Sequence, residues 1–299
     1  MTKSEKAINL SIGLPVYNGE DFVAEAIASL LAQTRGDFEL VISDNHSTDR
    51  TWDIVSDYTK RDARIRAFRQ PENIGPAANF AFVMHEARHS AFMWAAADDV
   101  WHPRWVETLL PIVLERPCLA YGQLITIDSK GAAWPHPADR RPFSFTGGRL
   151  ARRMRFYLMP SLLGRANPIY GIFRREMFNP AVWKTFESVP HASDVLALYE
   201  ILKDREIVCG GEVYLYKRRH DGSGVNPQPA ESTVRKRRRR FKRTQLTDFM
   251  ARSNRLERAL LVALYPLAAL GTIAAKLQYF WVVATAKPDK DQKAMDHTG

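Results

Sequence analysis

The sequence predicts an α/β fold in which a mostly parallel central sheet is flanked by helices. Strand-like and helix-like segments alternate from Ile8 to Ile127, and strands separated by helices form parallel sheets from βαβ units. The chain has 299 residues, of which 45% are hydrophobic and 25% charged, a composition typical of a globular protein. This length accommodates one large α/β domain with an appendage, or two domains.

Apolar runs and helical periodicity define the expected elements. The periodicity is clearest in Glu20–Gln33, where apolar residues recur at three- and four-residue spacing. Up to residue 127 we expect strands at 8–15, 38–43, 65–69, 91–97 and 119–127, separated by helices at 20–33, 48–60, 77–88 and 103–114. Beyond Asp128 we expect a loop or short hairpin at 129–148, a helix at 150–163, an apolar run at 169–173, a helix at 194–203 and β segments at 207–208 and 213–217.

The net charge of +10 is concentrated at one end of the chain. Residues 231–299 hold 15 Lys and Arg against 6 Asp and Glu, whereas residues 1–230 hold 28 against 27. This change predicts an α/β domain at 1–230 and a basic linker with an apolar helical tail at 231–299, joined through Pro227–Ser232. Two distant cysteines, Cys118 and Cys209, and the lack of a signal peptide predict a reducing, cytoplasmic setting.

Two adjacent carboxylates, Asp98 and Asp99, follow the apolar run 91–97. A buried strand that ends there delivers them to the carboxyl edge of the sheet, where open α/β sheets bind ligands. Adjacent carboxylates repel each other, so keeping both ionised favours a bound cation. The alternative is a solvated turn in which Asp99 caps the helix that begins near Pro103.

Loops after two other strands point to the same edge. In the loop formed by Pro15, Val16, Tyr17 and Asn18, a proline beside an aromatic ring offers a flat face on which a base can stack; the alternative is an ordinary turn. After the next strand, Asp44 and Asn45 supply acceptors for a pyrimidine N–H or for ribose hydroxyls, while Ser47–Asp49 suits a helix N-cap.

A third loop runs from Asn73 to Asn79. Gly75 permits a positive φ or a close backbone approach, and Pro76 fits the first helical position. Amide groups at the start of such a helix can bind an anion. The P-loop, the dinucleotide-binding glycine pattern and the Gly-x-Ser-x-Gly elbow do not occur, so the sequence excludes those site classes.

The four segments PVYN, ELVISDNHSTD, NIGPAAN and WAAADDVWHP, in this order, resemble the nucleotide-sugar glycosyltransferases of the GT-A fold. More narrowly, the chain from Ile8 to Asn226 resembles the inverting family two. The resemblance implies that the first two loops hold the nucleoside. It also implies that the acidic pair is the DxD motif, whose carboxylate binds Mn²⁺ or Mg²⁺ on the sugar diphosphate. Because Ala96 stands two positions before Asp98, we expect the metal on Asp99 and place Asp98 nearer the ribose or sugar.

The second half of the chain supplies two further candidate groups. Asp194 begins a predicted helix, where an aspartate is commonly an N-cap, but the resemblance implies that it is the catalytic base. Arg218 and Arg219 end a β segment and could neutralise a diphosphate, and His220 could join the metal as a nitrogen ligand. The alternative for these residues is a solvated basic hairpin.

The resemblance implies an inverting, metal-dependent glycosyltransferase that moves a sugar from a nucleotide-diphosphate donor, with UDP favoured, to a glycan or lipid-linked acceptor. Such a reaction fits cell-surface polysaccharide or lipid-linked glycan synthesis. The alternative, kept open by Ala96, is a non-catalytic nucleotide-sugar or polyanion-binding protein with the same fold. A homo-oligomer is compatible with either. The expected donor-binding residues are Pro15, Val16, Tyr17, Asn18, Asp44, Asn45, Asn73, Gly75, Asn79, Asp98, Arg218 and Arg219.

The tail combines a basic run at Arg235–Arg243 with apolar stretches at Ala259–Ala275 and Tyr279–Ala286, separated around Lys276. The first stretch falls short of the ~20 residues of a spanning helix. We therefore favour an interfacial anchor that holds the protein on the anionic inner face of the membrane, with a single span as the alternative. A soluble helical hairpin packed on the domain or on a second copy is another. A nucleic-acid-binding arm is not favoured, because it leaves the apolar stretches unexplained.

Overall fold

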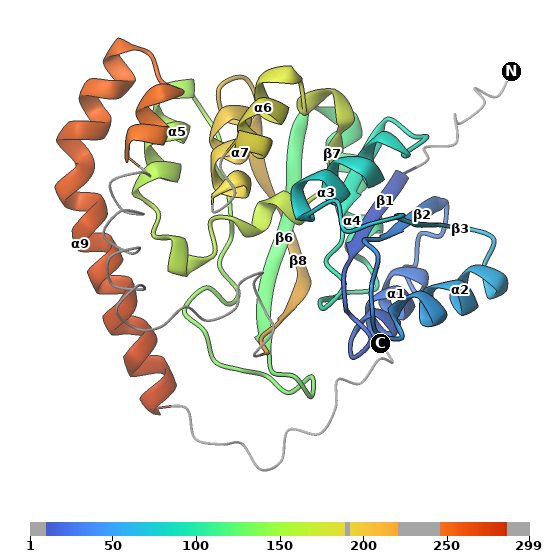
Figure 1. Ribbon diagram of the computed structural model, residues 1–299. Coiled ribbons are helices and arrows are strands. Elements are labelled where there is room, and N and C mark those ends of the chain that lie inside the picture. The colour runs from blue at the N-terminus through green and yellow to red at the C-terminus, as the bar shows by residue number, and fades with distance from the viewer. Residues whose placement is uncertain (1–9, 189–191, 221–245, 286–299) are drawn as a thin grey trace, which may run out of the picture.

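The computed structural model describes residues 10–188, 192–220 and 246–285. Its larger sheet has the strand order β3-β2-β1-β4-β7. Strands β1 to β4 pair in parallel and β7 is antiparallel to β4. The bounds are β1 Leu10–Val16, β2 Phe38–Asp44, β3 Ile65–Arg69, β4 Ala91–Trp94 and β7 Phe173–Arg174. The predicted α/β fold with a mostly parallel sheet is therefore confirmed (Figure 1).

The central strand β1 is buried along its whole length, as expected for a strand covered on both faces of a parallel sheet. Helix α3 (Pro76–His85) packs against β1 and β2. Gly13 permits this close packing, because a Cβ atom there would lie 2.6 Å from the Phe92 ring and 2.8 Å from a methyl group of Val83. Close packing at Gly13 therefore accompanies the position of β1 between β2 and β4, in the middle of the larger sheet.

The helices of the first half lie close to their predicted positions. They are α1 Val23–Leu31, α2 Thr51–Arg61 and α4 Trp105–Glu115. Helix α1 buries the apolar positions that set its periodicity, and α2 packs on β3 while α4 packs on β6 and β8. Apolar positions at helical spacing therefore predicted both the elements and their buried faces.

A second sheet with the order β5-β8-β6 continues the fold. It contains β5 Val100–Trp101, β6 Cys118–Ile127 and β8 Glu206–Arg218. Strand β6 is joined to the first sheet by two backbone hydrogen bonds between Ala120 and Ile172, at 2.8 and 2.9 Å. Strand β8 runs parallel to β6 and antiparallel to β5, so its C-terminal end reaches the segment that follows Asp99.

The structure corrects three expectations about strands. The strand expected at 91–97 ends at Trp94, and the following alanines have low β propensity, so the acidic pair lies in a turn before β5. The two β segments expected at 207–208 and 213–217 are one strand, in which Gly211 absorbs an irregularity at φ +109°. Strand β5 was not expected, because two residues carry no periodicity.

The middle of the chain is more irregular than expected. Helix α5 (Arg149–Leu158) ends before Pro160, which disfavours helical continuation, and Ser161–Leu163 forms a separate 3-10 turn, η1. Two further 3-10 turns, η2 (Asn167–Tyr170) and η3 (Arg175–Met177), flank β7. Helix α6 (Pro180–Ser188) was not expected, whereas α7 (Ser193–Ile201) matches its prediction closely.

The apolar tail forms one continuous helix, α9 (Arg255–Thr285), of 31 residues. The expected interruption does not occur, and Pro266 lies within the helix. At 1.5 Å per residue, α9 is about 46 Å long, and it packs along α5 and η1 on the side of the molecule away from β3 (Figure 1). The expected linker Pro227–Ser232 and basic run Arg235–Arg243 lie outside the described residues.

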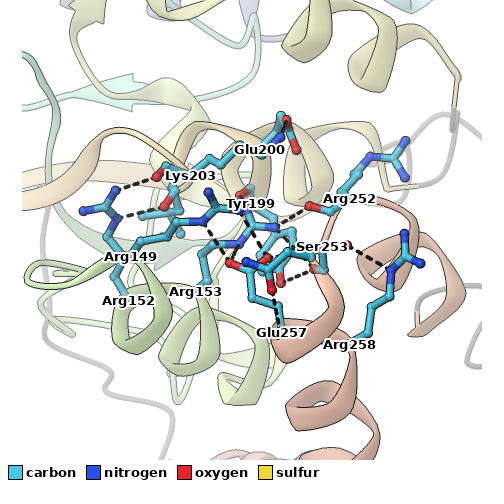
Figure 2. A network of polar contacts seen from close by, with 12 residues as sticks. Arg149, Arg152, Arg153, Tyr199, Glu200, Lys203, Arg252, Ser253, Glu257 and Arg258 are labelled. Carbon is cyan, nitrogen blue, oxygen red and sulfur yellow. Dashed lines mark hydrogen bonds and ion pairs between the residues drawn. The ribbon is translucent and has the colours of Figure 1, made fainter.

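A buried ionic network fastens the start of α9 to α5 and α7 (Figure 2). The Glu257 carboxylate lies 3.0 Å from Arg149 and 3.3 Å from Arg153, and the side chains of Glu257 and Arg153 are both almost fully buried. The Arg153 guanidinium also donates to the carbonyl oxygens of Tyr199 and Arg252 and lies 3.7 Å from the Tyr199 ring centroid. These contacts give α9 a fixed position against the α/β domain.

Candidate active site

The loops after β1 and β2 lie side by side at the carboxyl edge of the sheet. Val16 pairs with Asp44 in the parallel register, and the Asn45 N–H donates to the Val16 carbonyl at 2.8 Å. Pro15 and Val16 are buried within β1. Tyr17 follows with 48% of its surface exposed, which leaves an aromatic face at this edge of the sheet.

The side chain of Asn18 helps to build the loop. Asn18 adopts a positive φ of 48°, its N–H donates to the Ser47 hydroxyl at 2.9 Å, and its Oδ1 accepts from the Thr48 N–H at 2.9 Å. These bonds clip the loop after β1 onto the loop after β2. The amide oxygen of Asn18 therefore acts within the protein.

Asp44 is fully buried, yet one of its oxygens lacks a hydrogen bond. Its Oδ1 accepts from the Ser47 N–H at 3.1 Å. Its Oδ2 has no hydrogen bond within the described residues, although the Arg69 guanidinium lies 3.4 Å away. This oxygen is paired with the Arg69 charge but accepts no hydrogen bond from the described residues, and buried polar atoms usually have one, so Asp44 can still accept a hydrogen bond from a nucleoside.

Three asparagines that were expected to bind the donor connect loops to one another. The Asn45 amide donates to Asn73 Oδ1 at 3.0 Å and accepts from the Ile74 N–H at 2.9 Å. Asn79 exchanges hydrogen bonds with the side chain and the carbonyl of Ser43. Gly75, at φ +83°, precedes α3 as expected. This set shapes the base of the site.

The two acidic residues have different environments. Asp99 is completely buried, and its oxygens accept from Lys217 Nζ at 3.1 Å and from the Arg218 N–H at 2.8 Å. Asp98 keeps 32% of its side chain exposed and lies 3.2 Å from His220 Nε2. Burial, opposed by Lys217 and reinforced by Asp98, raises the pKa of Asp99 to about 6. Asp99 is therefore still mainly ionised at neutral pH and serves as the internal partner of Lys217.

The two arginines at the end of β8 also differ. The Arg218 guanidinium is buried, donates to the carbonyl oxygens of Asp98, Asp128 and Ser129, and pairs with Glu25. Arg218 thus ties the acidic turn to β6 and α1. Arg219 is exposed, so it is the arginine of this pair with its charge at the surface.

Asp194 lies in the first turn of α7 and is partly buried. Burial raises the pKa of its carboxyl group, against a hydrogen bond from the Val195 N–H and the charges of Lys217 and Arg165. Burial likewise raises the pKa of Tyr170 to about 12, with contributions from Asp98, Asp99 and Asp194. The hydroxyl of Tyr170 therefore lies in the field of all three carboxylates.

Known proteins resemble this chain in sequence and in fold. A model of the family described as Glycosyl transferase family 2 matches residues 11–179. The chain belongs to this family. The match includes β1 to β4, the acidic turn and β7, and it ends before Asp194 and the end of β8.

Among curated relatives, TuaG of Bacillus subtilis, a glycosyltransferase named for teichuronic acid biosynthesis, is 35% identical over 36% of this chain and 43% of its own length. The chain therefore spans less than half of that relative. The glycosyltransferase GlyG of Streptococcus pneumoniae is 21% identical over 70% of this chain and 71% of its own length.

Solved structures share the GT-A-like fold. S. aureus TarS 1-349 in complex with UDP-GlcNAc has a TM-score of 0.61 at 16% identity, covering 91% of this chain and 73% of that one. The mannosyltransferase PcManGT of Pyrobaculum calidifontis in complex with GDP-Man and Mn²⁺ has a TM-score of 0.55 at 14% identity, covering 93% and 76%.

The described residues of this family-two chain could hold a metal ion only together with ligands from the substrate. In the described ranges no three His, Cys, Asp or Glu side chains gather in a way that could hold a metal ion. Hard cations often bind through one or two carboxylates together with substrate phosphates and water. The 3.2 Å pair of Asp98 and His220 fits such a site, in which a diphosphate supplies further oxygens.

Sequence reasoning missed the internal role of Lys217. Its ammonium group lies 3.1 Å from Asp99 and 5.1 Å from the centre of the Tyr170 ring. Burial lowers its pKa, but the Asp99 carboxylate and other nearby acids outweigh that effect and raise it. The available signal was its position at the end of an apolar β segment, which does not identify a partner 118 residues away.

Proposed function

We propose that this family-two chain transfers a sugar from a nucleotide-diphosphate donor to an acceptor hydroxyl, with inversion at the anomeric carbon. The observation that carries the proposal is the buried Asp44 oxygen that has no hydrogen bond within the described residues. It lies at the end of β2, whose neighbour β1 leads into the exposed Tyr17. A carboxylate oxygen accepts from the N–H of a pyrimidine and an aromatic ring stacks on a base, so a uridine donor is favoured. The UDP-GlcNAc in the TarS complex supports the same choice.

Asp194 is the proposed base. Its carboxylate accepts the proton of the acceptor hydroxyl as the hydroxyl oxygen attacks the anomeric carbon, on the face opposite the departing nucleoside diphosphate. The exposed guanidinium of Arg219 offsets negative charge on the leaving group. Asp98 and His220 would hold a divalent ion, which would supply Lewis-acid stabilisation of the same diphosphate. The accessibility of Asp98, in contrast to Asp99, supports moving the metal from Asp99 to Asp98.

Metal-dependent binding distinguishes Asp98 from Asp99. Asp98→Ala is expected to weaken Mn²⁺-dependent binding of UDP by about ten- to hundredfold or more, because losing even an outer-shell partner of a metal costs that much. Thermal shift with UDP and Mn²⁺ reports the change, since a ligand stabilises the state that binds it. Asp57→Ala, which removes an exposed carboxylate of α2, is the matched control.

Asp99→Ala provides the opposing outcome. It leaves the partly buried Lys217 without its carboxylate partner, so we expect a lower free energy of unfolding and a retained response to Mn²⁺. If Asp99→Ala keeps its stability and loses the Mn²⁺ response, while Asp98→Ala keeps both, the metal is on Asp99.

A non-catalytic binding protein is the second candidate, favoured by Ala96 at a position where the resembled motif has an acid. The distinguishing measurement is release of UDP from UDP-sugars with Mn²⁺ and no acceptor. Slow release that disappears in Asp98→Ala supports the enzyme. Tight donor binding without release, even with candidate acceptors, supports the binding protein.

We propose that α9 attaches the protein to the inner face of a membrane. In the described part of the chain, α9 is the helix whose length and composition suffice to cross a membrane. Most of its circumference is apolar and exposed, including Leu270, Ile273, Leu277, Phe280 and Trp281, each more than half exposed. Helix α9 packs lengthwise on α5 and η1. This packing supports an interfacial position, because an α9 that spanned the membrane would carry α5 and η1 into the lipid.

Vesicle flotation tests this proposal. Full-length protein is expected to float with vesicles of phosphatidylglycerol and phosphatidylcholine. The combined change of Leu277, Phe280 and Trp281 to Ser should leave most of it unbound, because each buried apolar side chain contributes about 1.5–3 kcal/mol. Protein that stays with the soluble fraction at low salt and without detergent contradicts the membrane proposal. Equal flotation with purely zwitterionic vesicles contradicts the electrostatic part of it.

A further inference from the structure

The last turns of α9 contact the exposed arginine of the candidate active site. The Arg219 guanidinium donates to the Tyr279 hydroxyl and lies 5.8 Å from the centre of the Tyr279 ring and 5.4 Å from that of Trp134. The Arg219 backbone N–H is fixed separately, at 2.8 Å from the Ile127 carbonyl. Both the backbone and the charged end of Arg219 are thus held by residues distant from it in sequence.

Tyr279 is itself held in place by the loop that follows β6. Its ring lies 5.5 Å from the His136 ring, and the neighbouring Gln278 accepts from Arg141 at 3.3 Å. The loop is ordered by Asp139, which accepts from the N–H groups of both Thr126 and His136. A continuous set of contacts therefore joins the end of α9 to β6.

The same loop reaches the acidic turn by a second route. Arg218 donates to the carbonyl oxygens of Asp128 and Ser129, where the loop begins, and to the carbonyl of Asp98. His220, directly after Arg219, lies 3.2 Å from the Asp98 carboxylate. Arg219 therefore lies between two residues, Arg218 and His220, that contact Asp98. Its guanidinium is the part of this turn that contacts α9.

An exposed arginine loses considerable side-chain entropy when it is held in one rotamer. Contact with Tyr279 and Trp134 restricts the Arg219 guanidinium before a ligand arrives, and a group fixed in advance binds more tightly because less ordering remains. Arginine uses a planar fork of five N–H donors, so a hydrogen bond to one hydroxyl leaves donors for phosphate oxygens.

We propose that Tyr279 is a positioning residue, which together with Trp134 holds Arg219 in the orientation that receives the donor diphosphate. The proposal rests on the proposed function, since it assumes that a nucleoside diphosphate binds beside Asp98. It assigns α9 a role in the donor site in addition to its proposed role at the membrane. In this proposal α9 both anchors the protein at the membrane and, through Tyr279, positions Arg219.

Calorimetric titration of the full-length protein in detergent, with Mn²⁺ present, tests this role. The probes are UDP and uridine, which differ by the diphosphate. Tyr279→Ala is expected to raise the Kd for UDP about three- to tenfold, the effect of losing a cation–π contact and its hydrogen bond, and to leave the Kd for uridine unchanged. Tyr279→Phe keeps the ring and should give an intermediate value. Tyr265→Ala, which removes a partly exposed tyrosine elsewhere on α9, should match the unmodified protein.

Each result has one meaning. A Kd for UDP that is unchanged in Tyr279→Ala overturns the positioning role. Equal weakening of UDP and uridine also overturns it, because a general disturbance of the fold would affect both. If Tyr279→Ala does not fold, the Phe variant decides: a Kd for UDP equal to that of the unmodified protein excludes a role for the hydroxyl and overturns the proposal as stated. If the unmodified protein binds UDP no better than uridine, the proposed donor site itself fails.

Discussion

Asp194→Asn is expected to lower kcat by about 10²- to 10⁴-fold, the usual contribution of a positioned general base, while the affinity for UDP changes little. Asparagine keeps the size and hydrogen-bonding shape of the side chain but cannot accept the acceptor's proton. Steady-state kinetics with the UDP-sugar that releases UDP fastest, together with UDP titration, measures both quantities. Asp204→Asn, an exposed position just after α7, is the matched control.

The pH dependence supplies an independent check on Asp194. Burial raises the pKa of its carboxyl group, and the base must be ionised to act. Turnover should therefore fall as the pH drops through this raised pKa, at a higher pH than an unperturbed aspartate near 3.9 would give. An Asp194→Asn variant that retains full activity, or retains the same acidic limb, places the base elsewhere.

Glu257→Ala is expected to lower the free energy of unfolding by about 3–5 kcal/mol, because it leaves the buried Arg153 without its counter-charge. Glu257 is 1% exposed and contacts both Arg149 and Arg153 at the junction of α5 and α9 (Figure 2). Urea unfolding in detergent, followed by tryptophan fluorescence, measures the change. Glu212→Ala, at an exposed position of β8, is expected to change the value by less than about 0.5 kcal/mol.

The acid sensitivity of this junction follows from the same contacts. Burial alone would raise the pKa of Glu257, but hydrogen bonds from Arg149 and from the Asn254 N–H, with the charge of Arg153, lower it. A lowered folded-state pKa contributes stability above the unfolded-state value, and this contribution is lost as the pH falls through the folded-state pKa. Glu257→Ala should therefore lose less stability than the unmodified protein on acidification. An identical acid profile and an unchanged urea midpoint would show that the ion pairs contribute nothing.

The sequence predicted the layered part of the fold because its signals are local. The apolar run of β1 and the periodicity of α1 depend on neighbouring residues, and so does the strand-to-loop change at Asp44. These predictions locate the carboxyl edge of the sheet. The brief elements were missed for the same reason, since β5 has two residues and shows no local pattern that could distinguish it from a turn.

The sequence could not decide which of two adjacent side chains faces inward. Asp99 is internal because Lys217 and the Arg218 N–H approach it from β8, and Asp98 is left beside His220. In the same way, Arg218 is buried and Arg219 is exposed. Such choices depend on residues more than 100 positions apart, so they follow from the packed fold and not from the motif.

The tail illustrates a similar limit. Its composition predicted an apolar helix, but Lys276 suggested a separation between two stretches that the structure joins in one helix. Its place along α5 depends on Glu257 meeting two arginines that lie about a hundred residues earlier. The contact between Tyr279 and Arg219 depends in turn on that placement. None of these pairings has a local signal.

The most direct test of the central claim is a crystal structure of the full chain with UDP and Mn²⁺, using anomalous scattering to locate the metal. The account predicts a manganese peak bonded to Asp98, His220 and diphosphate oxygens, with the base against Tyr17 and Asp44 and with Asp99 still paired to Lys217. A peak bonded to Asp99, or a nucleotide bound away from Tyr17 and Asp44, would contradict it.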